Sequence, residues 1–456
     1  MVDPTTFLPG LSPVCGKPLQ ARFDGGMVSS DGGLLLFREI ENRLGLANRL
    51  AACVNDPRDP DLITHTAADI LRFRMLGIVA GYEDGVDCNT LRTDPVFKLA
   101  LDRLPESGDR LCSQSTVSRL ENTPSRTALY RLGRALVDQY CASYPKVPGR
   151  IILDLDDTFD AAHGQQQLCL FNAHYDEHGF QPIVIFDDTG RLVTAVLRPA
   201  KRPSGREILT LIKRVVARIR ANWPQVRITL RGDGHYACPE VMAWSQAEGH
   251  KFIFGLPGTT TYLKHVTELS ASTLARFQAM KTANPKLPEA TKVRRYKEFY
   301  DCAKSWDRVH RISARVEAGS QGVDVRFIVT NIEGKTAKRL YEDIYCARGQ
   351  MENHIKSYKR HLAADRTSCT AATANQFRLF LHAGAYWLVW AFQQSVPKRS
   401  RWRTAQFDTI RLKLVKLGAR IEELKKAIRV HLPTACPVEP ILRCIASRIP
   451  MVRMLA

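Results

Sequence analysis

The spacing of hydrophobic residues changes near residue 150 and separates a helical first third from an α/β middle. In residues 32–140 apolar positions recur every three or four residues, which predicts amphipathic helices, among them one at 34–46 and one at 67–78. Residues 145–150 have the composition of a linker. Beyond them, short apolar runs bounded by turn residues predict β-strands.

The middle of the chain contains an ordered series of predicted elements. They are strands at 151–156, 182–186 and 191–197, a helix at 206–222, a strand at 226–230, a helix at 239–248 and a strand at 251–255. Residues 187–190, Asp-Asp-Thr-Gly, have the chemistry of a hairpin turn. This order is that of the RNase H-like fold, in which the first and fourth strands are neighbours. Carboxylates at the ends of those two strands, Asp156 and Asp233, are therefore expected to converge.

The hydrophobic pattern after residue 255 indicates an insertion and then further helices. Val323, Val325, Phe327 and Val329 alternate as in a strand, whereas 337–361 and 373–394 have helical spacing. The fold class expected is α/β, an RNase H-like catalytic core interrupted by a β-rich insertion. The expected regions are a helical N-terminal DNA-binding region (1–145), the two parts of the core (146–255 and 333–395), the insertion (256–332) and a basic helical C-terminal region (396–456).

Charge adds an indication of the partner. The chain has 456 residues, enough for two or more domains, and a formal net charge of +20. Nucleic acid is the commonest polyanionic partner of such a basic protein, although a basic surface can also serve solubility alone. The density of Lys and Arg in 396–456 favours phosphate contact over a merely solvated helical face.

Other features concern the compartment and the membrane. The twelve cysteines form no Cys-x-x-Cys pair and no zinc-finger spacing, which predicts reduced thiols. The N-terminus does not read as a signal peptide, and the most apolar stretch, 377–392, is too short to span a bilayer. We expect a cytoplasmic, nucleoid-associated protein without a membrane partner.

A short helix start at 113–120, rich in Ser and Thr, is a second candidate for DNA contact. Its composition resembles that of a recognition helix of the helix-turn-helix type. The same residues are also common as ordinary helix caps, so both interpretations stay open.

The most specific pattern in the chain joins Tyr345, Arg348, Glu352 and Lys359. On a helix of about 100° per residue, these four side chains fall within about 60° of arc over about four turns. Such a stripe can place one carboxylate at a metal ion while the cations and the phenol hold phosphates on either side. The alternative is an ordinary surface stripe in which Arg348 and Glu352 form an i,i+4 pair.

The spacing Tyr-x2-Arg-x3-Glu-x6-Lys resembles the signature of a large group of insertion-sequence transposases with a DDE triad. The chain looks most similar to the branch named after insertion sequence 1380. Further segments that resemble that branch are 81–84, 91–95, 154–158, 231–233, 407–411 and 417–420. The resemblance therefore covers nearly the whole chain.

The resemblance implies a role for each matching residue. Asp156, Asp233 and Glu352 would be the catalytic triad and would bind two divalent ions, Mg²⁺ with Mn²⁺ as a substitute. Tyr345, Arg348 and Lys359 would contact phosphates of the transposon end.

Some positions have more than one interpretation. Trp306 is placed to stack on a flipped base, or else it is a core aromatic. Asp154 is the alternative first metal ligand, since it shares a strand face with Asp156, whereas Asp157 points to the opposite face. His235 and His354 are interpreted as structural.

The function implied is cut-and-paste DNA transposition without an organic cofactor. The protein would bind the terminal inverted repeats of its element as a homodimer, cut the DNA through a hairpin intermediate and join the element to target DNA. One alternative is another RNase H-like nuclease or integrase. The other is a DNA-binding regulator without activity.

Overall fold

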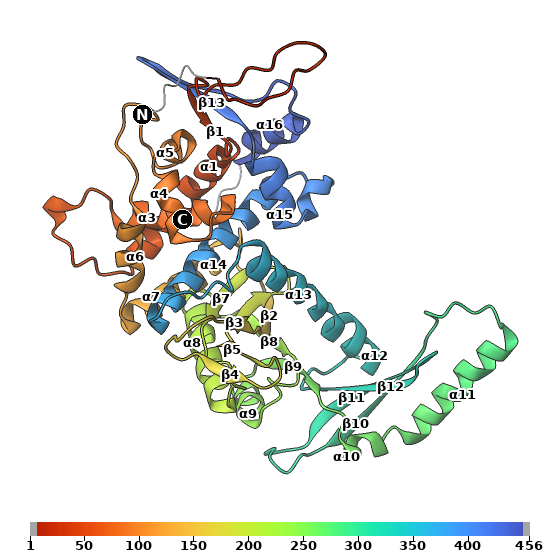
Figure 1. The fold of residues 1–456 in the computed structure, drawn as a ribbon. Coiled ribbons are helices and arrows are strands. Elements are labelled where there is room, and N and C mark those ends of the chain that lie inside the picture. Colours follow the sequence, from red (N-terminus) through yellow and green to blue (C-terminus); the bar gives the residue numbers. More distant parts are fainter. Residues whose placement is uncertain (1–6, 450–456) are drawn as a thin grey trace. The chain divides into compact units, whose positions relative to one another are not determined.

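A mixed eight-stranded sheet organises the part of the chain that carries the acidic residues. The computed structural model describes residues 7–449, in which the strand order of this sheet is β10-β11-β12-β9-β8-β2-β6-β7 (Figure 1). The strands are β2 (Arg150–Asp157), β6 (Ile183–Asp187), β7 (Leu192–Val196), β8 (Arg227–Gly232), β9 (Lys251–Leu256), β10 (Val293–Asp301), β11 (His310–Gly319) and β12 (Gly322–Thr330). Only the β2–β8 and β8–β9 pairs are parallel, so the fold is mixed α/β.

The chain divides into two compact units. The larger consists of residues 129–360 and 364–383, and the smaller of residues 1–128, 361–363 and 384–453, as far as these are described. The division falls within two helices, α7 (Arg126–Ala142) and α14 (Ala372–Ser395).

The sheet of the larger unit is covered by helices that the sequence specifies locally. Helix α8 (Gly205–Asn222) begins with a capping box in which Ser204 and Glu207 exchange hydrogen bonds, and its apolar stripe, including Ile212 and Val216, is buried. Helix α9 (Pro239–Ala247) follows β8. Gln376 of α14 bonds to the backbone of β7 and of the residue after it, which protects that edge strand from pairing with another chain.

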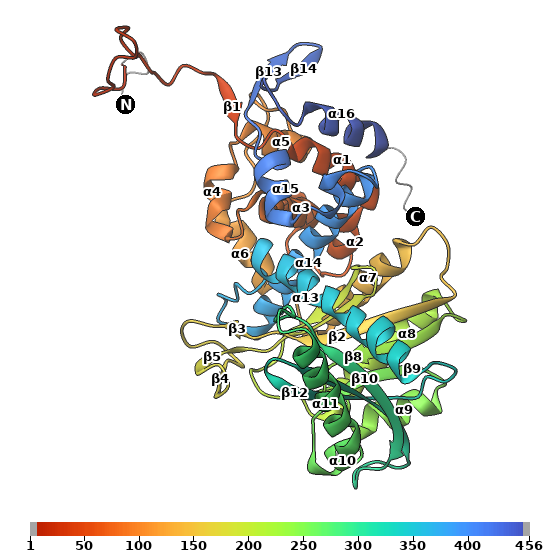
Figure 2. The same ribbon diagram turned by 90° about the vertical axis from the view of Figure 1, so that its right-hand side faces the viewer.

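The insertion extends the central sheet and contains two helices that the pattern did not predict. Strand β12 pairs with β9, so β10, β11 and β12 continue the core sheet. Helices α10 (Thr260–Lys264) and α11 (Thr267–Ala283) precede them, and α11 covers one face of these strands (Figure 2). Only Thr273 and Phe277 of α11 are buried, too few to produce a helical hydrophobic period.

A second departure is a small sheet between β2 and β6. It consists of β3 (Asp160–Ala161), β4 (Leu170–Asn172) and β5 (Glu177–Phe180) in the order β3-β5-β4. These strands have two to four residues each, which is too short for an alternation to be recognised.

The predicted long helix at 337–361 is irregular. It comprises α12 (Ala337–Arg339), a π segment η3 (Leu340–Tyr345), a 3₁₀ turn η4 (Cys346–Arg348), α13 (Gly349–Lys356) and a second π segment η5 (Ser357–His361). Its direction is continuous, but the angular spacing of its side chains differs from that of an ideal α-helix.

The smaller unit is mainly helical with one small sheet. Its helices are α1 (Leu34–Leu44), α2 (Leu46–Ala51), α3 (Ala67–Ala80), α4 (Cys88–Leu91), α5 (Pro95–Ala100), α6 (Gln114–Asn122), α15 (Phe407–Ile410) and α16 (Glu439–Arg448). Strands β1 (Met27–Ser29), β13 (Ala419–Leu424) and β14 (Ala427–His431) pair in the order β1-β13-β14. The C-terminal region, expected to be helical, therefore contains a hairpin whose two turn residues are Lys425 and Lys426.

Two further observations concern the whole of residues 7–449. None of the helices there combines the length and the apolar character that a membrane span requires. None of the twelve cysteines forms a disulfide, as their spacing predicted.

Candidate active site

The ends of β2 and β8 bring the predicted acidic residues to one edge of the sheet. The two strands are parallel, with Asp154 opposite Arg231 and Leu155 opposite Gly232. Continuing this register places Asp156 beside Asp233, because parallel neighbours end at the same edge. The convergence expected from strand order is therefore present.

Asp154 forms a buried ion pair with Arg231. Its side chain and that of Arg231 are 4% and 2% exposed, and Arg231 donates to both carboxylate oxygens, with 2.7 Å between Nη2 and Oδ2. The same guanidinium also donates to the carbonyl of Ile344. Burial raises the pKa of Asp154, whereas Arg231 opposes that shift. This pair fastens segment η3 to the strand ends.

Asp156 lies next to Arg348 of the irregular helix at 337–361, called the signature helix because it carries Tyr345, Arg348, Glu352 and Lys359. Its Oδ2 is 2.7 Å from Nη2 of Arg348, and the two side chains are 13% and 16% exposed. Burial raises the pKa of Asp156 to about 7; Arg348 opposes the shift, while Asp233 and Asp157 add to it. Closely spaced carboxylates with so little solvent form a site that favours a bound cation.

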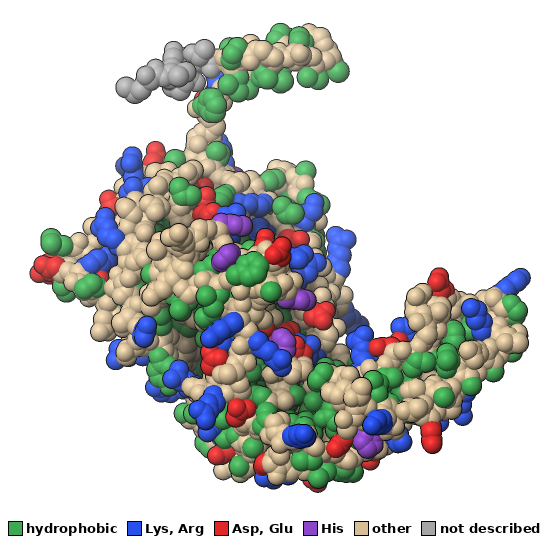
Figure 3. Space-filling model, turned by 60° about the horizontal axis from the view of Figure 1, so that its bottom comes forward, with side chains coloured by type: hydrophobic (Ala, Val, Ile, Leu, Met, Phe, Trp, Pro, Cys, Tyr) green, Lys and Arg blue, Asp and Glu red, His purple; other side chains and the backbone are tan. Residues whose placement is uncertain are grey.

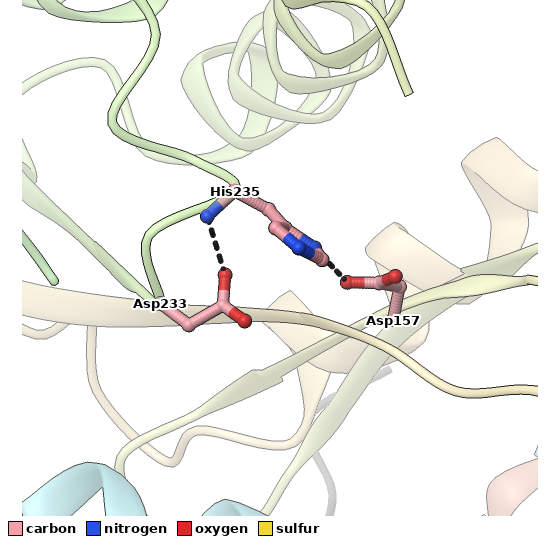
Figure 4. Close-up of side chains that lie close together, drawn as sticks. All are labelled: Asp157, Asp233 and His235. Carbon is pink, nitrogen blue, oxygen red and sulfur yellow. Dashed lines mark hydrogen bonds and ion pairs between the residues drawn. The ribbon is translucent and has the colours of Figure 1, made fainter. Parts of the chain in front are cut away.

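Asp157, Asp233 and His235 form the tightest group of possible metal ligands within residues 7–449. One ligand atom from each lies within 4.8 Å of the others. The backbone N–H of His235 donates to Oδ1 of Asp233 at 2.9 Å, and its Nδ1 lies 3.4 Å from Oδ1 of Asp157 (Figure 4). The hydrogen bond to Asp157 raises the pKa of His235.

Sequence reasoning did not select Asp157 and His235 for this site. Asp157 is the last residue of β2, and strict alternation along the strand assigned it to the face opposite Asp156. The signal that could have found His235 is its place two residues after Asp233, in the short turn that follows β8.

Tyr345 reaches the strand ends through a contact that only glycine permits. A Cβ at Gly255, near the end of β9, would lie 2.6 Å from the hydroxyl oxygen of Tyr345. Burial raises the pKa of Tyr345, Arg348 lowers it and Asp233 raises it further, which reflects how near both charges are. The phenol thus lies beside the acidic cluster.

Lys359 anchors the far end of the signature helix to the segment after β2. Its Nζ is 3.1 Å from Oδ1 of Asp160 and 3.2 Å from Oγ1 of Thr158. Asp160 is 2% exposed, and burial raises its pKa to about 7 although Lys359 lowers it. Tyr345, Arg348 and Lys359 therefore all lie along the edge that holds the acidic residues.

Glu352 is the signature residue that the structure does not bring into the cluster. It lies on α13 between Arg348 and Lys359, and its side chain is exposed. Within residues 7–449 it has neither a side-chain hydrogen bond nor an ion pair, and it does not belong to the ligand group around Asp233.

Trp306 and His354 lie in packed surroundings. Trp306 packs partly buried against the core of the insertion and edge-on to His310, with 5.1 Å between ring centroids. His354 lies against Phe186 and beneath Gly190, where burial lowers its pKa. The packing of Trp306 agrees with its interpretation as a core aromatic, and the packing of His354 agrees with its interpretation as a structural histidine.

The donor set at this edge fits a divalent ion. Asp156, Asp157 and Asp233 offer carboxylate oxygens, the hard donors that Mg²⁺ binds in proteins. Burial and the neighbouring carboxylates raise the pKa of Asp156, and Arg348 offsets this shift only in part, so a bound cation would stabilise the charged form of Asp156.

Comparison with known proteins gives the family. A family model described as "Transposase DDE domain group 1" matches residues 11–454. No curated protein matches the chain. Among solved structures, a cryo-EM structure of a piggyBac transposase synaptic complex with hairpin DNA is similar at 10% identity, covering 85% of this chain and 80% of that one, with a TM-score of 0.39. The family match spans nearly all of the sequence, and so the chain belongs to the transposases with a group 1 DDE domain, which bind DNA and transfer its phosphoryl groups with divalent metal ions.

Proposed function

We propose that this protein is the transposase of a bacterial insertion sequence of the 1380-like branch, with an RNase H-like catalytic core. It binds the terminal inverted repeats of its element as a homodimer, cuts the DNA at their boundary and joins the element to target DNA. The observation that carries the proposal is the meeting of Asp156 and Asp233 at adjacent parallel strand ends, beside the helix that carries Tyr345 and Arg348.

Asp156, Asp233 and Glu352 are the proposed metal ligands, and Mg²⁺ is the proposed ion. Asp154 is a poor alternative, because Arg231 occupies both of its oxygens. Asp157 and His235 are close enough to Asp233 to contribute to the same site. When bound, the ions supply charge for the attacking and leaving oxygens of an in-line displacement.

Glu352 can reach this site from its place on the helix. It lies four residues after Arg348, a rise of about 6 Å along an α-helix, and on nearly the same face. Because its side chain is exposed, it can rotate toward the carboxylates without breaking an existing bond. An ion shared with Asp156 and Asp233 would offset the repulsion among the three groups.

The other signature residues position DNA. The guanidinium of Arg348, now paired with Asp156, can turn its donors to a phosphate, and two parallel bonds would fix that phosphate's orientation. The hydroxyl of Tyr345 can donate to a neighbouring phosphate oxygen. Lys359 keeps the segment after β2 in place through Asp160.

Binding of the element ends requires further basic surface. Lys and Arg side chains are spread over the face drawn in Figure 3, in keeping with the net charge of +20. In the smaller unit, Arg420, Lys425, Lys426 and Arg429 on the β13–β14 hairpin are exposed. The exposed side of α6 is the second candidate for contact with the repeat.

The test uses purified protein, Mg²⁺ and a duplex that carries the inverted repeats flanking the gene. We expect cleavage at the repeat boundary and a loss of about 100-fold or more in Glu352→Gln and Asp233→Asn, equivalent to about 2.7 kcal/mol. Glu333→Gln, which removes an exposed carboxylate from the loop before α12, is the matched control and should cut normally.

The other outcomes distinguish the alternatives. Cleavage without preference for the repeats would indicate a different nuclease or an integrase. Specific binding without cleavage would indicate a regulator. Full activity of Glu352→Gln would exclude Glu352 from the triad.

A further inference from the structure

The outer end of the insertion sheet contains an open, positively charged pocket. It has a volume of about 380 Å³ and is lined by the turn between β11 and β12 (residues 319–322). Six charged side chains also line it: Lys292, Arg294, Arg315, Glu317, Asp324 and Arg326. Four cations and two carboxylates leave an excess of two positive charges. None of these residues belongs to the signature or to the acidic cluster.

One carboxylate of the pocket is already neutralised by two cations. Glu317 is 8% exposed, and its two oxygens lie 2.5 Å from Nζ of Lys292 and 2.6 Å from Nε of Arg294. This group is complete, so it neither requires nor excludes a ligand. Half of the excess of two positive charges belongs to this group, and the other half to Arg315, Arg326 and Asp324.

Arg315 and Arg326 share the single remaining carboxylate. They are directly opposite each other on the antiparallel strands β11 and β12, an arrangement in which like charges destabilise a sheet. Asp324 lies 3.0 Å from Nε of Arg326 and 3.6 Å from Nη2 of Arg315. One carboxylate cannot offset two guanidinium groups, and an additional anion between them would relieve the repulsion.

The guanidinium of Arg315 is positioned by packing and keeps a donor available for such an anion. Its side chain is 12% exposed, and its guanidinium lies over the ring of Tyr341 at 4.9 Å. The Nε of Arg315 is buried and has no hydrogen-bond partner in the described residues. A buried donor without a partner destabilises the folded chain, and a suitably placed acceptor would offset that cost.

The pocket lies on the sheet face that carries the signature helix. Arg326 and Ile328 share this face by alternation, and Ile328 packs with Leu340 and Tyr341 of that helix. Ile328 is paired with Gly255, whose neighbour is the hydroxyl of Tyr345. Two residues along a strand and one strand spacing separate Arg326 from Gly255, roughly 8 Å between backbones.

We propose that this pocket binds a backbone phosphate of the DNA on which the acidic site acts, with Arg315 and Arg326 as the two phosphate ligands. The proposal rests on the proposed function and assigns a contact outside the signature residues. Arginine suits this position because its planar donors match two phosphate oxygens. Since phosphates carry no base identity, the contact would fix the position of the DNA and not its sequence.

The experiment compares Arg326→Gln with Arg276→Gln. Arg326 is 65% exposed, so its replacement leaves the fold intact, and Arg276 is an exposed cation on α11, which covers the opposite face of the insertion strands. Affinity for the repeat duplex is measured over a range of NaCl concentrations. We expect Arg326→Gln to make the slope of log K against log salt shallower by about 0.9, the value for one lost phosphate, with no change in Arg276→Gln.

Two further measurements complete the design. Inorganic phosphate at millimolar concentration, compared with chloride of equal ionic strength, should lower the affinity of the parent for the duplex more than that of Arg326→Gln, because it competes for the same pair of arginines. An equal reduction in both proteins would overturn the DNA assignment. Equal slopes in the two variants would also overturn it. If the parent cuts the duplex in that case, the proposed function stands, whereas a parent that neither binds nor cuts contradicts both.

Discussion

Replacing Asp156 by Asn should stabilise the folded protein while it abolishes DNA cleavage. The reason is the burial of this carboxylate beside Asp233 and Asp157, which raises its pKa from 3.8 to about 7. The charged form is thus disfavoured in the folded chain relative to the unfolded chain. An amide of the same shape removes the charge and keeps the packing.

The size and sign of the effect follow from linkage. The pKa of Asp156 is higher in the folded chain than in the unfolded chain, so the protonated carboxyl group contributes to stability. This contribution is fully present below about pH 4 and is lost as the pH rises toward 7. The rise of the pKa from 3.8 to about 7 corresponds to a loss of stability of about 4 kcal/mol at pH 8 and of about 1.7 kcal/mol at pH 5. The gain from Asp156→Asn should therefore be larger at pH 8 by about 2–3 kcal/mol.

Urea unfolding at pH 5 and pH 8 measures this difference. At pH 8, added Mg²⁺ should stabilise the parent more than the variant, because an ion bound only to the folded state adds to its stability. A variant that is less stable than the parent at pH 8, or a gain that does not depend on pH, would show that Asp156 is not a destabilised carboxylate. Mg²⁺ that stabilises both proteins equally would place the ion elsewhere.

The remaining predictions concern the residues that hold the site together. Arg231→Met should destabilise the protein by about 3–5 kcal/mol in urea unfolding, since it leaves the buried carboxylate of Asp154 without its counter-charge. Gly255→Ala should displace the phenol of Tyr345 and cost about 1–3 kcal/mol, and adding Tyr345→Phe should restore most of that loss in a double-mutant cycle. Lys359→Met should lower both stability and cleavage, because it leaves a carboxylate that is 2% exposed without its cation; unchanged unfolding would contradict this.

The sequence predicted the core of the fold because its elements are locally determined. Five strands of five to eight residues, β2, β6, β7, β8 and β9, contain apolar runs, and α8 has both a capping box and a continuous apolar stripe. The short strands β3–β5 and the weakly amphipathic α11 lack such signals. Their structure depends on partners distant in sequence, which periodicity does not report.

The site was predictable to the level of strand ends but not of individual contacts. Asp156 and Asp233 follow from the order of strands, whereas the ion pair of Asp154 depends on the register that places Arg231 opposite it. The predicted stripe assumed a uniform helix. The π and 3₁₀ segments around Tyr345 change the angle between successive side chains, and no propensity in residues 340–348 indicates them.

The irregular helix accounts for the placement of the signature residues along the acidic edge. Arg231 holds the carbonyl of Ile344, directly before Tyr345, while Asp160 holds Lys359 fourteen residues later. With both ends fixed to strand ends, the turns between them must fit the distance that the sheet imposes, and π and 3₁₀ turns adjust the length and rotation of a helix locally. Arg348 then points at Asp156, and Glu352, one turn further, remains exposed on the same side. The buried pair of Asp154 and Arg231 therefore fixes the position of the signature helix at Ile344, next to the carboxylates at the strand ends.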